Sequence, residues 1–191
     1  MTDDLKPWFP IRTERLLLRE FRQADFDDVH AYATQPEVVR FMDWGPNTPD
    51  ETQAFLGRMF EAQARWPRDD VNLAVEHRAD GRVIGSIRLG ANNPAEHSAD
   101  LGYSFNRDYW RQGIATEAAR AMLDVAFRVL GVHRVWAWCD VRNAGSYGVM
   151  EKLGMRREGE LKQNVHVKGD WRTTYLYAIL ADEFDASRRG A

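Results

Sequence analysis

The chain has 191 residues, of which 44% are hydrophobic and 29% charged, and we expect one globular domain over residues 1–191 with its core at about 12–181. Its 26 lysine and arginine residues and 29 aspartate and glutamate residues leave a net charge of −3. That balance argues against a nucleic-acid partner, because contacts to phosphates favour a clearly basic face.

The N-terminal part of the chain predicts one strand and two helices. Residues 15–21 have the pattern of a strand, and residues 24–33 that of a short helix. Trp-Gly-Pro at residues 44–46 indicates a turn. Residues 48–51, Thr-Pro-Asp-Glu, combine a threonine cap, a proline at the first helical position and a glutamate at the third. The helix that starts there is expected to end near residue 65.

The middle of the chain predicts three consecutive strands. Residues 71–78 and 82–89 are strand-like and are joined by Ala-Asp-Gly at residues 79–81, a good hairpin connection. We expect a loop at residues 90–96, which are rich in asparagine, proline and alanine, and a third strand at residues 97–105.

The C-terminal half begins with the strongest helix pattern of the chain, between Gly113 and Gly131, where apolar residues fall on one face. Trp136 and Trp138 alternate onto one face of the next strand, and we expect both to pack there. The elements after Gly131 are expected to be a strand at residues 133–141, a helix at 144–153, and strands at 156–167 and 171–180. The whole order predicts an α/β protein with a mixed sheet of about seven strands and about four packed helices.

The cysteine and histidine content limits the chemistry. Cys139 is the only cysteine, so an intramolecular disulfide and a thiolate zinc cluster are excluded, and we expect this residue in the core. A single free thiol is typical of the reducing cytoplasm. The start of the chain lacks a signal-peptide pattern, and the longest apolar run, residues 175–181, is too short to span a membrane. The histidines show no metal-ligand spacing, so no metal site is expected.

Residues 109–118, Tyr-Trp-Arg-Gln-Gly-Ile-Ala-Thr-Glu-Ala, lead into the strongest helix. The first N–H groups of a helix have no partner inside it, and the helix dipole makes them attract anions. Gly113 lets a phosphate approach, small Ala115 leaves room, and Thr116 adds a hydroxyl. A plain strand-to-helix turn explains the same glycine, and neither a Walker sequence nor a dinucleotide fingerprint occurs.

Three further segments stand in register with this turn: TERLLLREF at residues 13–21, ADLGY at 99–103 and NAGSYGVMEKLGMRREG at 143–159. In this order and spacing the four segments resemble the GCN5-related N-acetyltransferase (GNAT) superfamily, and within it the ribosomal-protein N-acetyltransferase-like subgroup. The resemblance covers roughly residues 12–180.

The resemblance implies a GNAT fold, a mixed and mostly antiparallel sheet whose fourth and fifth strands, residues 97–105 and 133–141, splay apart. It implies acetyl-coenzyme A as co-substrate, with the pantetheine arm in the gap and the pyrophosphate on the turn at residues 112–116. The residues that it assigns to the co-substrate are Tyr103, Ser104, Phe105, Arg111, Gln112, Gly113, Ile114, Ala115, Thr116, Asn143, Ser146 and Lys152.

The sequence departs from the broad family pattern in two places. Trp110 stands where the pattern has glutamine or arginine, so Arg111 and Gln112 are expected to supply the polar contacts. Met150 stands where many relatives place a catalytic tyrosine, which excludes a tyrosine acid at that position. Residues 143–146, Asn-Ala-Gly-Ser, instead resemble the motif of the subgroup, which implies a serine near the thioester sulfur.

Acyl transfer to an amine needs a neutral nucleophile and benefits from a proton donor for the departing thiolate. We expect Ser146 to be this donor, although it can also be a cap or turn hydroxyl. Asn143 is expected to bond the pantetheine arm or a water, and it can equally cap the helix. Asp100 is the first candidate for a base acting through water and Asp140 the second, and Asp100 can instead be a surface aspartate on a strand.

The expected reaction is direct transfer of an acetyl group to a primary amine, either a protein N-terminal α-amine or an amine of a small molecule. Trp44 and Trp66 flank the second helix and can line the acceptor pocket or pack structurally. Another acyl donor such as succinyl-coenzyme A, an antibiotic acceptor, and a non-catalytic acyl-coenzyme-A-binding module are the alternatives. A homodimer is possible, and no nucleic-acid or membrane partner is expected.

Overall fold

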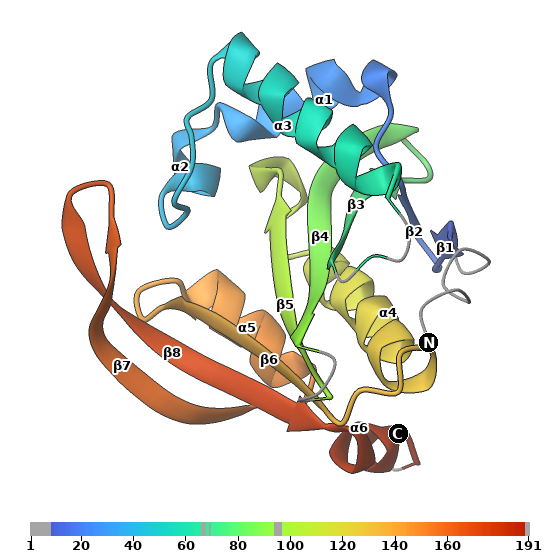
Figure 1. Cartoon of the computed structure of the whole chain (residues 1–191), viewed down its shortest axis with the longest axis vertical. Helices are drawn as coiled ribbons and strands as arrows, with labels where there is room; N and C mark the ends of the chain where they lie inside the picture. Colours follow the sequence, from blue (N-terminus) through green and yellow to red (C-terminus); the bar gives the residue numbers. More distant parts are fainter. Residues whose placement is uncertain (1–8, 66–67, 69, 94–96, 190–191) are drawn as a thin grey trace.

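A computed structural model describes residues 9–65, 68, 70–93 and 97–189 of the chain. Within these residues one mixed sheet runs in the order β1-β2-β3-β4-β5-β6-β8-β7 (Figure 1). The strands are β1 Ile11–Arg12, β2 Leu16–Arg19, β3 Asp70–His77, β4 Arg82–Asn93, β5 Ser98–Phe105, β6 Arg134–Asp140, β7 Arg156–Val167 and β8 Asp170–Leu180. The α-helices are α1 Phe26–Ala33, α2 Pro36–Val39, α3 Pro49–Gln63, α4 Ile114–Arg128, α5 Ala144–Lys152 and α6 Ala181–Arg189.

The sheet splits open between β5 and β6, the only parallel pair among the described strands. The two strands pair at Ser98 with Arg134, Ala99 with Val135 and Asp100 with Trp136, and the pairing stops there. Residues 101–105 of β5 and 137–140 of β6 therefore face a gap that widens toward α2 (Figure 1). This confirms the expected splay of the fourth and fifth long strands.

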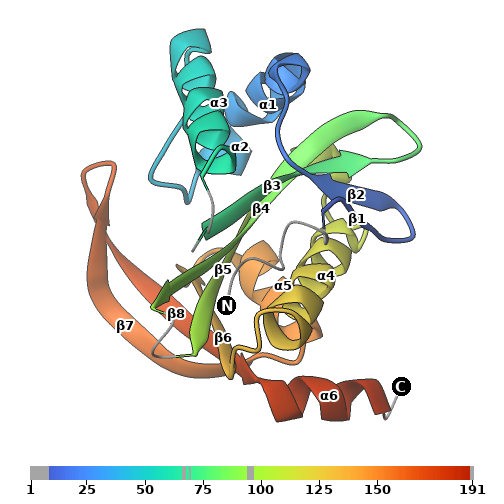
Figure 2. The same ribbon diagram turned by 45° about the vertical axis from the view of Figure 1, so that its right-hand side comes forward.

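Helices cover both faces of the sheet around β3 and β4 (Figure 2). Leu73 belongs to the hydrophobic cluster that contains Met122 of α4, whereas its neighbour Ala74 belongs to the cluster that contains Val29 of α1 and Leu56 of α3. Successive residues of a strand point to opposite faces, so this strand is buried on both sides. The α4–α5 layer lies on one face and the α1–α3 layer on the other.

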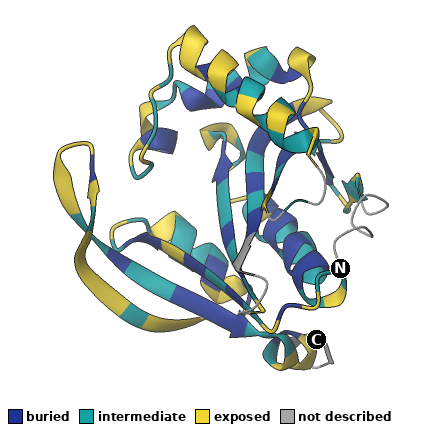
Figure 3. Cartoon of the chain, viewed as in Figure 1, coloured by how far each residue is buried: buried dark blue, intermediate teal, exposed yellow. Residues whose placement is uncertain are grey.

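The β6–β8–β7 part of the sheet has one open face (Figure 3). Helix α5 packs behind it, and the other face carries Trp138, which is 48% exposed, and half-buried Trp136. The expectation that both tryptophans pack is therefore wrong for Trp138. Cys139 points to the covered face and is buried, as expected.

The structure has more elements than the sequence predicts, with eight strands and six α-helices in the described residues. The expected strand at residues 15–21 is shorter, and residues 11–12 form a separate strand beside it. The expected loop at 90–96 is strand as far as Asn93, where an irregularity in the pairing of β4 with β5 lets the ladder continue, and residues 94–96 lie outside the described residues. Helices α2 and α6 were not predicted.

Candidate active site

The turn before α4 has the conformation of an anion site. Gly113 has a φ of 77° and Arg111 a φ of 60°, so the backbone reverses twice just before the helix. The first helical hydrogen bond runs from Glu117 N to Gly113 O at 3.0 Å. The N–H groups of residues 114–116 consequently have no partner within the helix and carry its positive dipole end. Successive backbone N–H groups in such a turn bind anions, which supports the expected pyrophosphate position.

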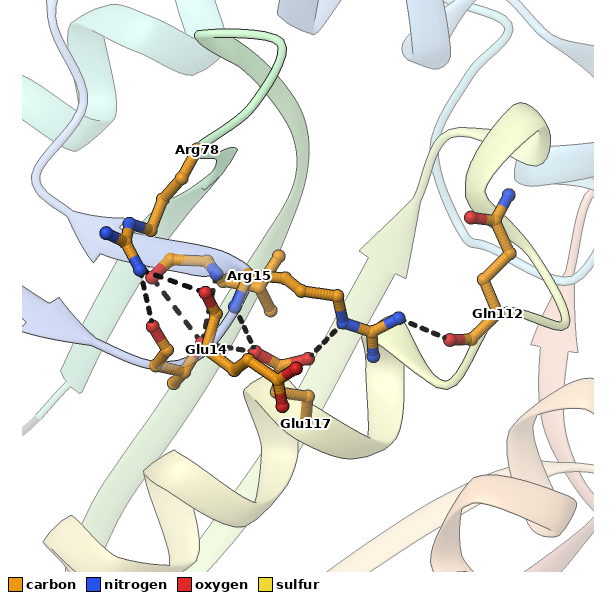
Figure 4. Close-up of polar contacts among 7 residues, drawn as sticks. Glu14, Arg15, Arg78, Gln112 and Glu117 are labelled. Carbon is orange, nitrogen blue, oxygen red and sulfur yellow. Dashed lines mark hydrogen bonds and ion pairs between the residues drawn. The ribbon is translucent and has the colours of Figure 1, made fainter.

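A network of charged residues ties this turn to β2 (Figure 4). The guanidinium of Arg15 donates from Nη1 to Gln112 O at 2.8 Å and from Nε to Glu117 Oε2 at 2.7 Å. The Arg15 main-chain N–H and the Thr13 hydroxyl donate to Glu117 Oε1 at 2.8 Å and 2.5 Å. Burial alone raises the pKa of Glu117, but the hydrogen bonds from Thr13 and Arg15 outweigh it and hold the pKa below its ordinary value. Glu117 is therefore an anion that fixes Arg15 against the turn.

Sequence reasoning missed Arg15 and Glu117 as parts of this site. Both lie in segments that carry the family resemblance, but they are 102 residues apart in the chain. No local sequence pattern predicts a contact between residues so far apart. The only sign of it in the sequence was that both segments of the family resemblance are present.

Trp110 has a structural role at the position where it departs from the family pattern. Its indole Nε1 donates to Phe105 O at 2.8 Å, which closes the turn onto the end of β5. Gln112 Nε2 donates to Asp108 O at 2.9 Å, so this side chain also braces the turn. The polar contact that we expected from Gln112 toward the co-substrate stays a prediction.

The main chain of β5 presents hydrogen-bonding groups to the gap. Asn106 N donates to Ile84 O at 2.8 Å on the β4 side. Because main-chain groups alternate sides along a strand, those of Phe105, Tyr103 and Leu101 point to the gap. Phe105 O already accepts from Trp110, which leaves the Phe105 N–H, the main chain of Tyr103 and the Leu101 carbonyl as the groups that can pair with an added extended chain.

Ser104 points the other way. Its main chain pairs with Ser86 of β4, and the two hydroxyl oxygens are 3.1 Å apart. Ser104 was expected among the co-substrate contacts, and the structure directs both its main chain and its hydroxyl into β4. Tyr103 is the better-placed contact of that segment.

Tyr103, Ser146, Asn143 and Cys139 form one cluster beside the gap. The Tyr103 hydroxyl donates to Ser146 O at 2.9 Å and lies 3.3 Å from Ser146 Oγ. Asn143 Oδ1 accepts from Ser146 N at 3.2 Å, so its capping role is confirmed and its role toward pantetheine stays a prediction. Burial raises the pKa of Tyr103, and burial raises the pKa of Cys139 to about 11. The cluster therefore holds neutral hydroxyl and thiol groups at neutral pH, which are proton donors rather than bases.

Asp100 lies away from this cluster. It is three residues from Tyr103 on the same strand, so the two side chains point to opposite faces of the sheet. Its carboxylate is paired with Arg88, whose Nε also donates to Asp70 Oδ2 at 2.6 Å. The structure does not bring Asp100 and Ser146 together, and the base role of Asp100 stays a prediction without support from contacts.

Asp140 is a buried structural carboxylate. It accepts from Arg142 N at 2.9 Å and from Arg142 Nη2 at 2.6 Å, and it is 5% exposed. Hydrogen bonds from Arg142 hold its pKa below the ordinary value. Asn143 N donates to Asp140 O at 2.9 Å, so this residue shapes the turn that starts α5.

The remaining predicted site residues are placed as follows. Lys152 is exposed at the end of α5, where its carbonyl accepts from Arg120 Nη2 at 3.2 Å. Trp44 is half-buried beside the α1–α3 cluster, and its carbonyl accepts from Lys168 Nζ at 2.8 Å. Trp66 lies outside the described residues. Among those described, no group of three histidine, cysteine, aspartate or glutamate side chains could hold a metal ion, and no helix is long and apolar enough to cross a membrane.

Comparison with known families gives an acetyltransferase (GNAT) domain over residues 15–156. The chain belongs to the GNAT acetyltransferase family. It is 34% identical over 175 residues to the uncharacterized N-acetyltransferase YnaD of Bacillus subtilis (strain 168), covering 92% of this chain and 99% of that protein. The [ribosomal protein uS5]-alanine N-acetyltransferase of Escherichia coli (strain K12) is 24% identical over 96% of this chain and 79% of its own.

The fold agrees with that of a solved N-acetyltransferase structure. A spermidine N-acetyltransferase from Vibrio cholerae, in complex with CoA and spermine, superimposes with a TM-score of 0.75 at 20% identity, covering 90% of this chain and 99% of that one. The resemblance to the superfamily is thus confirmed, and this GNAT protein is an acetyl-coenzyme-A-dependent N-acetyltransferase.

Proposed function

We propose that this GNAT protein acetylates a primary amine by direct attack on the thioester while both substrates are bound. The observation that carries the proposal is the gap between β5 and β6. One side of it has main-chain groups that β6 does not pair, a turn with the conformation of an anion site lies at its open end, and the Ser146 cluster lies beside it. Such a gap holds two reactants next to each other, and holding them together supplies a large part of the rate.

The residues present fit acetyl-coenzyme A. Main-chain groups of Leu101 and Tyr103 would pair with the pantetheine arm, and the N–H groups at residues 114–116 would hold the pyrophosphate. Gly113 suits the approach of a phosphate, because its φ of 77° is one that other residues rarely adopt. When bound, the co-substrate supplies an activated acetyl group and a thiolate leaving group.

The chain's own groups then manage the protons. The attacking amine loses one proton and the departing thiolate gains one. Ser146 is positioned to pass it on, giving its hydroxyl proton to the thiolate and taking the proton of the amine in its place. The Tyr103 hydroxyl holds Ser146 by donating to the Ser146 carbonyl at 2.9 Å. Main-chain N–H groups of the splayed strand stabilise negative charge that develops on an oxygen in the gap. Asp100 and Asp140 are both engaged with arginine, so neither is a ready base.

The lack of a ready base at these two positions favours an α-amine as acceptor. An α-amino group has a pKa of about 7.7–8.0 and a lysine amine about 10.4, so only the former is substantially neutral near pH 7 without help. The acceptor we propose is therefore an α-amine, of a protein N-terminus or of a small molecule.

Ser146→Ala tests the role of the hydroxyl. Acetyl-coenzyme A at about 100 times its dissociation constant should raise the unfolding midpoint of wild type and variant alike by about 5–10 °C. The rate of acetyl transfer to α-amines, measured by the release of the coenzyme A thiol, should fall by roughly 100-fold or more in the variant. Ser98→Ala, at the closed end of the gap, is the matched control and should retain turnover.

The two readouts separate the alternatives. A midpoint shift without acetyl transfer to any amine would indicate a non-catalytic acyl-coenzyme-A-binding module. A larger midpoint shift and faster turnover with succinyl-coenzyme A than with acetyl-coenzyme A would identify the succinyl compound as the donor. No shift with any acyl-coenzyme A would contradict the assignment of the gap itself.

The expected homodimer and cytoplasmic location stay proposals. Strand β7 is the outermost strand of the sheet, and an unpaired strand edge can pair with a second copy. A light-scattering mass of twice 22.0 kDa would support the dimer, and a mass of one chain would contradict it. The one buried thiol suits a reducing compartment.

A further inference from the structure

The open end of the gap is bordered on the uncovered face of the sheet by the loop after α2 and by the turn between β7 and β8. Figure 1 shows the β7–β8 hairpin reaching toward α2. Lys168 in the hairpin turn donates from Nζ to Val39 O at 3.0 Å and to Trp44 O at 2.8 Å. Phe41 of the same loop lies under the Arg142 guanidinium at 5.8 Å from the ring centre. These contacts bring the loop after α2 and the β7–β8 turn together on the opposite face from α4 and α5, and we call this region the entrance.

Arg172 of β8 is the cation of this entrance whose hydrogen bonds are least complete. Asp140 pairs with Thr174 in the register of β6 and β8, and Arg172 lies two residues from Thr174, so it shares the face of Asp140. Its side chain is 14% exposed. Its Nη1 is 3.4 Å from Asp140 Oδ2 and its Nη2 is 3.5 Å from Asp170 Oδ2, both at the outer limit of a hydrogen bond.

The third nitrogen of Arg172 has no acceptor at all among the described residues. Nε is fully buried and unpartnered. Asp140 cannot supply more, because Arg142 already donates to both of its oxygens at 2.8 Å and 2.6 Å. Asp170 is 71% exposed, so its contact with Arg172 is in water. A guanidinium with one unpartnered nitrogen and two long contacts is poorly satisfied in the protein alone. An oxygen anion would give its two Nη groups the short hydrogen bonds that they lack.

Resting on the proposed N-acetyltransferase function, we propose that Arg172 determines acceptor specificity by binding a carboxylate of the acceptor. The acceptor is then an amine that carries an acidic group, and a polyamine is a poor substrate. A guanidinium matches a carboxylate in two parallel hydrogen bonds, which a single ammonium cannot reproduce. A polyamine offers no carboxylate to this guanidinium.

The spacing along β6 bounds how far the acidic group lies from the amine. The gap begins after Trp136, and Asp140, which Arg172 approaches, is four residues further along the strand. At about 3.3 Å per residue this is roughly 13 Å. A free amino acid with an acidic side chain and a peptide with an acidic residue near its N-terminus both meet this limit, and they share the chemistry that Arg172 recognises.

Matched acceptors that differ by one charge test the inference. We would measure kcat/KM for aspartate α-amide against asparagine α-amide, and for C-terminally amidated tripeptides that begin Ser-Asp against Ser-Asn, with spermidine as the polycation. Wild type should prefer the acid of each pair by about 10- to 100-fold, the effect of one charge-assisted contact. The amino-acid amides and the peptides distinguish the two sources of the carboxylate.

Variants of Arg172 separate recognition from support of the fold. Arg172→Gln should lose the 10- to 100-fold preference while its rate on the uncharged partners is kept, and Arg172→Lys should restore part of it. Arg157→Gln is the control on the same hairpin, because its guanidinium lies over the Tyr175 ring on the other face. A purely structural role would lower both members of each pair equally.

A binding measurement makes the result independent of turnover. The N-acetylated Ser-Asp peptide, a product of the proposed reaction, should bind wild type at least about tenfold more tightly than Arg172→Gln, by titration calorimetry. Equal rates on acids and amides in wild type, or equal binding by both proteins, would overturn the role of Arg172. Acetylation of no amine at all, despite a shift with acetyl-coenzyme A, would instead refute the proposed function.

Discussion

Replacing Glu117 with glutamine isolates the charge that holds the pyrophosphate turn. The carboxylate accepts from the Thr13 hydroxyl and the Arg15 main chain on Oε1, and from the Arg15 guanidinium on Oε2. Glutamine has nearly the same shape and can keep the first pair of hydrogen bonds. It would turn an amide N–H₂ toward the Arg15 Nε–H, so a charge-assisted hydrogen bond is replaced by two opposed donors.

The cost of this change follows from the contacts. A hydrogen bond to a charged group contributes about 1.5–3 kcal/mol, and the Glu117 and Arg15 side chains are 17% and 38% exposed, so the lower part of the range applies. A loss of about 1.5–2 kcal/mol lowers the unfolding midpoint of a chain this size by about 3–8 °C. Because Arg15 also holds the Gln112 carbonyl, we expect the KM for acetyl-coenzyme A to rise by up to about tenfold, with a smaller change in kcat.

The contribution of Glu117 to stability depends on pH. The pKa of Glu117 in the folded protein lies below its ordinary value, so its ionised form stabilises the fold above about pH 4.3, and this contribution is lost as the pH falls through the folded value. The midpoint difference between wild type and Glu117→Gln should therefore be full at pH 7 and shrink below about pH 4. Exposed Glu61→Gln on α3 is the control and should change stability by less than about 0.5 kcal/mol. An unchanged unfolding midpoint, or an unchanged KM for acetyl-coenzyme A, would refute the role of Glu117 in holding Arg15 against the turn.

Three further changes test other parts of the site. Gly113→Ala should raise the dissociation constant of acetyl-coenzyme A in calorimetry and cost about 1–2 kcal/mol in urea unfolding, because a side chain is strained at a φ of 77°; equal affinity would contradict the anion site. Tyr103→Phe should lower kcat without changing co-substrate affinity, since it removes the hydroxyl 3.3 Å from Ser146 Oγ; an unchanged kcat would show that Ser146 needs no partner. Cys139, with its pKa raised to about 11, should resist iodoacetamide at pH 8 until the protein unfolds, because only the thiolate reacts; rapid labelling of the native protein would be inconsistent with its burial.

The long amphipathic patterns predicted most of the fold. The capping box at Thr48 and the apolar face of the helix after Gly113 gave α3 and α4 nearly as observed. Helix α2 has four residues and α6 is strongly polar, and neither length nor composition makes such elements visible to a periodicity argument. The continuation of β4 to Asn93 depends on pairing with β5, which local sequence does not encode.

For the site, local reasoning located the turn and the serine but not what holds them. The cap formed by Asn143 is a contact across three residues and could be expected from its type alone. The Arg15–Glu117 pair and the Arg172–Asp140 contact join residues far apart in the sequence, so only the fold reveals them. One feature of the site could be predicted from the sequence alone. Side chains alternate along a strand, so Asp100 and Tyr103 lie on opposite faces of the sheet, and the proposed base is thereby separated from the Ser146 cluster.

This separation of faces gives the gap two unlike sides. On the α4–α5 side, the turn and the Tyr103–Ser146 pair offer N–H groups and neutral hydroxyls, which suit phosphates and a departing thiolate. On the uncovered side, the carboxylates of Asp100 and Asp140 are paired with arginines. Arg172 there makes only two long hydrogen bonds, and its Nε has no partner. Asp140 links the two, because its side chain meets Arg172 while its carbonyl accepts from Asn143 N at the start of α5. An acidic acceptor bound at Arg172 would therefore lie beside Asp140, the residue whose carbonyl positions the start of α5 and with it Ser146.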